Sequence, residues 1–428
     1  MQRAERRQME WLPMTLDDLI PPGHAARSVW EFVEHMDLTG LYARIAAVEG
    51  RPGRDTIDPK ILMALWLYAT IDGVGSARKL DDLCKRHHAY RWLCGGVSVN
   101  YHTLADFRTS QVALLDQLLT ASVASLLSAG LIQLQRVAQD GMRVRTSAGR
   151  SSFRRRPKLE ECYAEAQQQV EVLRSESEEA DPAAGSRREQ AARQRAARER
   201  VERLQQALQE MAKLEAQKES RQKGSKEKAR VSTTDPEARV MKMANGGFDP
   251  AYNVQFSTTT DTQVIVGVAV INSGNDGGQL APMNEQIFER YGKSPDESLV
   301  DGGFSTLSDI ETLTTSPHGS TVYAPVKDEE KKRKKGENPY APRPADSAAV
   351  AAWRQRMGTA EAKEIYKERG ATAECINAIT RNRNLRFIRV RGLVKARAIA
   401  LWHVLAHNLM RGLALRAEWR ALSVQATG

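Results

Sequence analysis

Three acidic residues stand in surroundings that suit metal-assisted chemistry on phosphate esters. Asp140 ends the predicted strand 134–140, and Asp301 ends a short apolar run and precedes two glycines. Glu374 is the last acid before residues 375–417, which hold no Asp or Glu and many arginines. Carboxylate oxygens suit Mg²⁺, and paired metals on such ligands cleave phosphodiester bonds. The pattern predicts a metal-dependent phosphodiester site built from these three acids.

Basic residues lie near two of these acids, Glu374 and Asp140. Tyr366 and Arg369 precede Glu374, and Arg381 follows it by two helical turns, on the same helix face. We predict that Tyr366, Arg369 and Arg381 contact phosphates beside the acids. A second basic run follows Asp140, and we interpret it as tracking a nucleic-acid backbone. Its members are Arg143, Arg145, Arg154, Arg155 and Arg156. The alternative interpretation is an ordinary solvated charge run.

Each acid also has a plainer interpretation, because an Asp at a strand end often forms a turn. Glu364 and Glu368 compete with Glu374 for the third position, since they lie on the same predicted helical segment. Three further acids could be auxiliary or structural: Asp249, Asp261 and Asp276.

Residues 366–413 resemble the catalytic C-terminus of DDE transposases of bacterial insertion sequences, in particular the eleven-eighty-two branch. The resemblance rests on Tyr366, Arg369 and Glu374, on the arginine-rich stretch after them, and on the sequence Leu-Ala-His-Asn-Leu at 405–409. Residues 301–304 and 137–145 resemble the other two acid motifs of that family, and the likeness includes residues 21–108. The chain departs from the family pattern at Cys375, where Pro is usual, and at Arg381, where Lys is usual.

The resemblance implies a transposase that binds terminal inverted repeats, cleaves DNA strands and transfers 3′-hydroxyl ends into target DNA. It implies two Mg²⁺ ions, which Mn²⁺ could replace, held by Asp140, Asp301 and Glu374. It also implies double-stranded DNA as the partner and a homodimer or larger synaptic assembly. Two alternatives stay open: a nuclease of the same fold without joining activity, and a catalytically inactive DNA-binding regulator.

Composition agrees with a polyanionic partner. The chain has 428 residues, with 63 Lys and Arg against 53 Asp and Glu, a net charge of +10. No apolar stretch approaches the ~20 residues of a membrane span, and no signal peptide opens the chain, so we expect no membrane association and a cytoplasmic, nucleoid-associated protein.

The four cysteines are scattered, which argues against a disulfide framework. Cys84 and Cys94 lie near three histidines in the sequence, but the spacing is ragged for a zinc site. We therefore favour core cysteines and surface histidines over bound zinc.

Patterning predicts three parts. Residues 1–130 are predicted to form an all-helical, DNA-binding N-terminal domain, with a plain helical bundle as the alternative. Residues 159–230 are predicted to form an inserted helical hairpin and a mobile basic linker, with a break at Pro182. Residues 131–158 and 231–428 are predicted to form the catalytic domain: an α/β fold with an RNase H-like mixed sheet and helices on both faces.

Within that domain we expect a hairpin at 252–271, a helix at 280–291 and strands at 299–301 and 321–324. A charged loop is expected at 329–336. Helices are expected at 348–369, from Glu374 onward and at 393–419.

Overall fold

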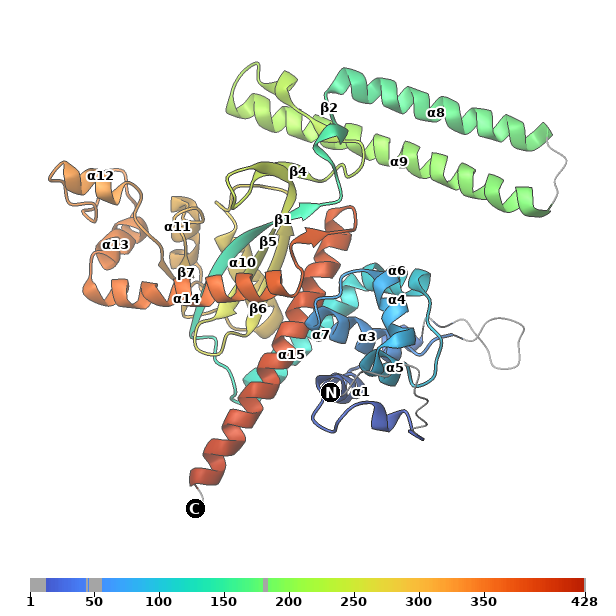
Figure 1. Cartoon of the computed structure of the whole chain (residues 1–428). Coiled ribbons are helices and arrows are strands. Elements are labelled where there is room, and N and C mark those ends of the chain that lie inside the picture. Colours follow the sequence, from blue (N-terminus) through green and yellow to red (C-terminus); the bar gives the residue numbers. More distant parts are fainter. Residues whose placement is uncertain (1–12, 44, 46–55, 180–183, 427–428) are drawn as a thin grey trace, which may run out of the picture.

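The computed structural model describes residues 13–43, 45, 56–179 and 184–426 (Figure 1). The first residues of the chain and the predicted break at Pro182 lie outside this range. Among the described helices, no single helix is long and apolar enough to span a membrane. Two consecutive helices, Tyr101–Ser110 and Val112–Ser128, meet the length and composition together, but they are bent by 64° relative to each other.

The N-terminal part is helical throughout its described residues. Its elements are η1 (Asp17–Leu19), α1 (Ala25–Glu34), α2 (Thr39–Tyr42), α3 (Pro59–Ile71), α4 (Ala77–Arg86), α5 (His88–Cys94), α6 (Tyr101–Ser110) and α7 (Val112–Ser128). The predicted start of α3 is confirmed: Asp58 accepts from the Lys60 amide and Pro59 takes the first helical position. Nearly every residue of α3 is buried, so this helix forms the centre of the N-terminal helices and is not available to contact DNA.

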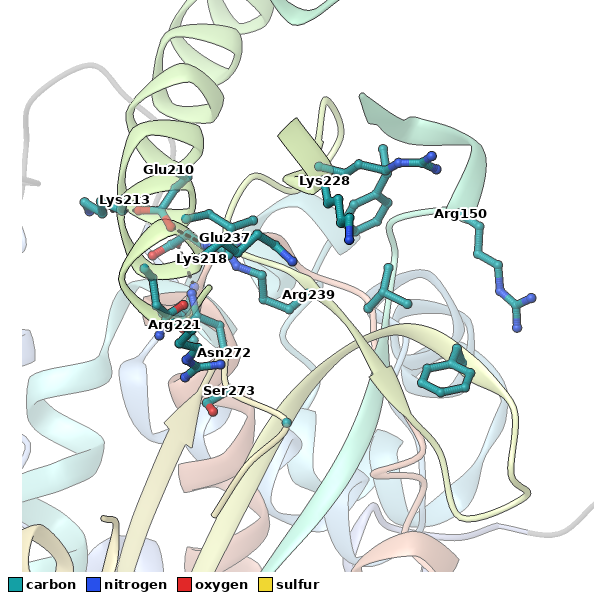
Figure 2. Close-up of a pocket in the computed structure, with 18 residues that line it drawn as sticks. Arg150, Glu210, Lys213, Lys218, Arg221, Lys228, Glu237, Arg239, Asn272 and Ser273 are labelled. Carbon is teal, nitrogen blue, oxygen red and sulfur yellow. Dashed lines mark hydrogen bonds and ion pairs between the residues drawn. The ribbon is translucent and has the colours of Figure 1, made fainter. Parts of the chain in front are cut away.

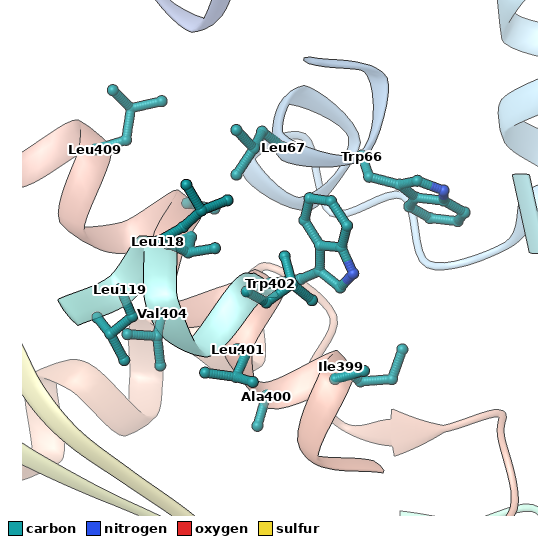
Figure 3. Packing of buried hydrophobic residues seen from close by; sticks show 14 of the residues in the cluster. Trp66, Leu67, Leu118, Leu119, Ile399, Ala400, Leu401, Trp402, Val404 and Leu409 are labelled. Atoms are coloured by element: carbon teal, nitrogen blue, oxygen red, sulfur yellow. The ribbon is translucent and has the colours of Figure 1, made fainter. Parts of the chain in front are cut away.

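Two tryptophans join the N-terminal helices to the last helix, α15 (Leu393–Ala426). Trp66 of α3 and Trp402 of α15 lie in one continuous hydrophobic core (Figure 3). Their indole N–H groups donate to the carbonyls of Leu104 and Arg108, both on α6. The N-terminal helices and the last helix are therefore packed as one body at this point.

One sheet carries the rest of the fold. Its strands are β1 (Arg136–Thr146), β4 (Arg239–Lys242), β5 (Phe248–Thr259), β6 (Ile265–Ile271), β7 (Glu297–Val300), β8 (Thr321–Tyr323) and β9 (Phe387–Ile388). β5 runs antiparallel to β1, β4 and β6, whereas β7 runs parallel to both β1 and β8. β9 is a short parallel addition at the far end of β1. The fold is thus mixed α/β.

Helices cover both faces of this sheet. The remaining ones in this part are α10 (Leu280–Tyr291), α11 (Leu307–Thr315), α12 (Glu329–Lys334), α13 (Ala348–Met357) and α14 (Ala360–Asn382). Gln139 of β1 bonds the Gln279 carbonyl at the start of α10, whereas its neighbour Asp140 accepts from Asn377 of α14. Because successive strand residues point to opposite faces, α10 and α14 lie on opposite sides of β1.

Several predicted bounds are confirmed, including the hairpin β5–β6 and α10 at 280–291. Three are wrong. β1 continues six residues past Asp140, because Met142, Val144 and Thr146 alternate as buried residues within what had been interpreted as a basic run. The charged loop at 329–336 contains a helix, α12. Glu374 lies inside α14, which begins after the Thr359 cap and passes through Gly370.

The predicted helical hairpin is present as α8 (Arg156–Glu179) and α9 (Ala184–Arg221), which project away from the sheet (Figure 1). Its seam buries Leu159 and Ala166 of α8 against Leu204, Ala207 and Met211 of α9. The predicted linker is partly ordered: it contains η3 (Lys226–Lys228), and Ala229 and Val231 pack on the seam. A two-stranded pair, β2 (Phe153–Arg154) with β3 (Val231–Ser232), closes the base of the hairpin.

The dipeptide His407-Asn408 of the 405–409 sequence anchors α15 to the sheet edge. Asn408 accepts from the Ile265 amide at 2.9 Å and donates to the Ile265 carbonyl at 2.8 Å. His407 Nε2 lies 2.8 Å from the Gln263 carbonyl. Among the strands that the structure describes, β6 pairs with β5 alone, so these side chains satisfy backbone groups that would otherwise stay open at the start of an edge strand.

Candidate active site

Asp140 and Asp301 come together on one face of the sheet. β1 and β7 are parallel neighbours in which Gln139 pairs with Val300, so the next residues of the two strands, Asp140 and Asp301, point to the same side. The Asp140 side chain is 19% exposed and that of Asp301 is 40% exposed. The pair therefore forms a carboxylate cluster that is open to solvent on the Asp301 side.

Arg369 of α14 bridges the two carboxylates. Its Nη2 atom lies 3.1 Å from Asp140 Oδ1 and 3.7 Å from Asp301 Oδ2. One positive group is thus close to both acids, which shows that the space between them accommodates a cation.

Each aspartate is also held by further hydrogen bonds. Asn377 Nδ2 donates to Asp140 Oδ2 at 2.9 Å, and the Gly141 amide donates to Asp140 Oδ1 at 2.9 Å. Asp301 Oδ1 accepts from the amides of Gly303, at 2.7 Å, and Phe304, at 3.2 Å. The chain thus turns back after Asp301, so that the amides of Gly303 and Phe304 orient the Asp301 carboxylate. The oxygens nearest Arg369 are Asp140 Oδ1, which also accepts from the Gly141 amide, and Asp301 Oδ2.

The electrostatics of Asp140 follow from its position. Burial raises the pKa of the Asp140 carboxyl, while the Arg369 guanidinium and the Gly141 amide lower it. The charges of Asp301 and Asp276 raise it further. Burial also raises the pKa of the Tyr366 phenol. The Arg369 charge lowers this pKa, and the charges of Asp301 and Asp140 raise it. Tyr366 and Arg369 therefore belong to the same cluster as the two acids.

Glu374 occupies the exposed flank of α14. It lies one turn before Asn377, the residue that holds Asp140, and next to the buried Ala373. It makes no hydrogen bond or ion pair with either aspartate among the described residues. Within that same part of the chain no three acidic, histidine or cysteine side chains form a metal-sized group. The structure thus brings two of the three predicted acids together and leaves the third exposed on α14, without a contact to either aspartate in the described part of the chain.

The competing third acids are engaged elsewhere. Glu368 accepts from Arg136 at 2.5 Å, and Arg136 also bonds Glu297, so this network ties α14 to β1 and β7. Glu364 pairs with Lys367 on the solvent side of α14.

Asp276, considered above as auxiliary or structural, is buried on the opposite face of β1. It accepts from Asn253, Gln255 and Arg143. A Cβ atom at Gly141 would lie 2.5 Å from Asp276 Oδ1, so the glycine next to Asp140 makes room for this acid.

The predicted phosphate-binding arginines after Asp140 do not form one open surface. Arg143 pairs with Asp276, Arg145 lies 3.6 Å from Asp249, and Arg156 pairs with Glu215 of α9. Arg154 donates to backbone carbonyls of its own turn. Arg155 is exposed, and Arg381 at the end of α14 is partly exposed. The sequence did not show that the first three of these arginines pair with Asp276, Asp249 and Glu215, because those acids lie more than 50 positions away along the chain.

Asn377 was also missed as a site residue. A signal was present, because it lies eight residues after Arg369, close to the same helix face.

Among the cysteines and histidines of the N-terminal part, Cys94 packs in the core, whereas His87 and His88 are exposed on the surface.

Comparison with known families gives two matches. Residues 14–110 match a family described as transposase domain (DUF772), and residues 325–413 match a family described as transposase DDE domain. No curated protein and no solved structure matches the chain. The second match includes Tyr366, Arg369 and Glu374, and the first includes α1 to α6. These two matches show that the chain is similar to transposase domains at both of its ends, over residues 14–110 and residues 325–413.

Proposed function

We propose that this chain is a DDE transposase of an insertion sequence, which cleaves DNA at the ends of its element and joins the 3′-hydroxyl ends to target DNA at a single site built from Asp140, Asp301 and Glu374. The observation that carries the proposal is the meeting of Asp140 and Asp301 at Arg369, beside the helix that bears Glu374. Cleavage and joining are both phosphoryl transfers, so one site can serve both.

An RNase H-like fold is part of this proposal. The strand order β6-β5-β1-β7-β8 has three antiparallel strands followed by two parallel ones. Asp140 lies on the central strand β1, and Asp301 directly follows its parallel neighbour β7. This placement supports the two aspartates as the catalytic pair of such a fold.

Asp140 and Asp301 would hold a divalent cation, Mg²⁺ or Mn²⁺, and Glu374 would complete the ligand set as its side chain turns toward them. Hard carboxylate oxygens fit such an ion, and the position of Arg369 beside both carboxylates supports a cation there. When bound, two such ions would activate the attacking oxygen and stabilise the leaving oxygen.

The chain's own residues position this chemistry. Asn377 and the Gly141 amide orient Asp140, and the amides of Gly303 and Phe304 orient Asp301. Arg369 would turn from the carboxylates to a DNA phosphate, and Tyr366 and Arg381 would contact the backbone on either side. A planar guanidinium can bind a phosphate through two donors.

DNA-end binding by the N-terminal helices belongs to the same proposal. α4 and α6 present a basic and aromatic surface, in which the exposed Arg78 stacks on the half-buried Tyr101. The guanidinium carbon of Arg78 lies 5.1 Å from the centroid of the Tyr101 ring. The turn before α4 contacts the end of α14, where Asn384 donates to the Gly73 carbonyl. A duplex on α4 and α6 would therefore continue toward α14. Acting on two ends would require a dimer or a larger assembly.

The test uses a labelled duplex that carries the element's terminal repeat. Purified protein with Mg²⁺ should cut at the repeat end and join the product to a second duplex, and Asp301→Asn should do neither while still binding the repeat. Cutting without joining would identify a nuclease, and binding without cutting by the unmodified chain would identify a regulator.

A further inference from the structure

A large basic cleft lies between the hairpin and the edge of the sheet. It has a volume of about 950 Å³. One wall is a stripe of α9, residues 210–221, whose lining members recur every three or four residues and so share one helix face. The other wall is formed by β4, by the start of β5 and by residues 272–274 (Figure 2).

The charge of the lining is strongly positive. Seven basic residues line the cleft: Arg150, Lys213, Lys218, Arg221, Lys228, Arg230 and Arg239. Only two acids, Glu210 and Glu237, accompany them. Glu210 is already paired with Arg239 and Lys213, and Glu237 accepts from the Leu393 amide.

Four of these cations have no carboxylate partner in the described part of the chain: Lys218, Arg221, Lys228 and Arg230. They come from the end of α9 and from the segment that follows it, and Figure 2 shows Lys218, Arg221 and Lys228 at the cleft. Unpaired cations gathered around a cavity attract a polyanion, because field lines concentrate in a concave, low-dielectric surface.

Two exposed apolar side chains stand on the same cleft. Phe248 is 55% exposed and Val240 is 48% exposed. Lys242 pairs with Phe248 across β4 and β5, so Val240 and Phe248 lie on the same face of the strands. An exposed aromatic ring beside unpaired cations is the combination that binds a nucleic-acid strand, with phosphates on the cations and a base on the ring.

We propose that this cleft is a second DNA-binding site, which holds a single strand of DNA with its phosphates on Lys218, Arg221, Lys228 and Arg230 and a base on Phe248. The inference rests on the proposed function only in taking DNA as the polyanion. The site is separate from the carboxylates, and the hairpin forms one of its walls. A strand bound there would be held between the sheet and the hairpin base.

The cation part is tested by fluorescence anisotropy with a labelled twenty-nucleotide poly-dT strand at several salt concentrations, without metal. Replacing all four cations by Ala should reduce the slope of log K against log salt by about 2 to 3 units, since each single-strand phosphate contact contributes roughly 0.7. The control is Arg187, Arg188 and Arg193 together to Ala, which removes three exposed cations from the same helix, roughly 40 to 50 Å from Lys218 and Arg221 at 1.5 Å per residue. It should change the slope by much less.

The base-stacking part is tested with Phe248→Ala and Phe248→Tyr. Phe248→Ala should weaken binding of the poly-dT strand about five-fold or more and leave an abasic strand of equal length unaffected, and Phe248→Tyr should keep the original affinity. Circular dichroism and melting confirm that each variant is folded.

Equal slopes for the four-cation variant and the unmodified chain, or equal effects of Phe248→Ala on both strands, would overturn the inference. Neither result depends on cleavage, so this failure is distinct from loss of the proposed activity. Inorganic phosphate serves as a competitor: displacement of DNA at low millimolar phosphate would show a small-anion site instead and would also overturn it.

Discussion

Arg369 reaches both aspartates of the proposed metal pair, with its Nη2 atom 3.1 Å from Asp140 Oδ1 and 3.7 Å from Asp301 Oδ2. A guanidinium in this position neutralises two carboxylates that would otherwise repel each other across neighbouring strands. The same position would be contested by a metal ion. Arg369 therefore links the arrangement of the two carboxylates to the binding of the proposed metal ion.

Arg369→Gln should lower the melting temperature in the absence of metal, because two like charges lose their shared partner. Mg²⁺ should then raise the melting temperature more in this variant than in the unmodified protein, because no side-chain cation competes with it. Differential scanning fluorimetry with and without Mg²⁺ measures both effects. Lys367→Gln on the same helix is the control, since Lys367 pairs with the exposed Glu364. An equal Mg²⁺ increment in both variants would show that Arg369 does not compete with the metal.

Asn377 is a positioning residue for Asp140, to which it donates at 2.9 Å. Asn377→Leu should raise the pKa of Asp140, because a hydrogen bond to the charged form is lost. The acidic limb of the pH profile of DNA cleavage should move upward by about one to two units, since hydrogen bonds to charged groups contribute roughly 1.5–3 kcal/mol and one pKa unit is about 1.4 kcal/mol. A lower rate with an unmoved limb would mean that Asn377 contributes only to folding.

Asn408 should be a major determinant of stability. It is buried and bonds both backbone groups of Ile265. Asn408→Leu should lower the free energy of unfolding by about 2–4 kcal/mol, because a donor and an acceptor on a buried strand lose their partners. Urea denaturation measures this loss. A loss below about 0.5 kcal/mol would show that water replaces the side chain at the sheet edge.

Two buried histidines predict acid sensitivity. Burial, helped by the charges of Arg108 and Arg383, lowers the pKa of His403 to about 3. Burial lowers the pKa of His407 to about 4, although its bond with Gln263 opposes the shift. In the unfolded chain both titrate near 6.5, so the unfolded state binds more protons as the pH falls below that value. The free energy of unfolding should then fall by about 1.4 kcal/mol per pH unit for each histidine.

Urea midpoints between pH 7 and pH 5 check this dependence. His403→Gln should remove about half of the histidine contribution, and His88→Gln, at an exposed position, should change nothing. If the unmodified protein and the His403→Gln variant show the same slope, His403 is not kept neutral by the fold.

The sequence predicted elements well where local chemistry decides the structure. The Asp58 cap with Pro59 marked the start of α3, and apolar periodicity marked α10 and the hairpin β5–β6. The prediction failed at β1, where alternating Arg143 and Arg145 hid the buried Met142 and Val144. It failed again at α14, because a single Gly inside a helix costs only about 1 kcal/mol and does not end it.

The partners of the site residues could not be predicted in the same way. The resemblance named Asp140, Asp301 and Glu374, but nothing local showed that Arg369 would join the first two or that Arg136 would hold Glu368. Those contacts depend on how α14 crosses β1 and β7. They arise from the tertiary structure, between residues more than 60 positions apart.

The identity of the third acid is the most direct test of the proposed site. We compare Glu374→Gln with Glu368→Gln on the same helix, and measure Mg²⁺-dependent cleavage of a labelled terminal-repeat duplex alongside binding of that duplex and melting. Glu374→Gln should abolish cleavage and keep binding, whereas Glu368→Gln should keep cleavage with a modest loss of stability from its ion pair with Arg136. Cleavage that survives Glu374→Gln and disappears with Glu368→Gln in a folded protein would contradict the assignment.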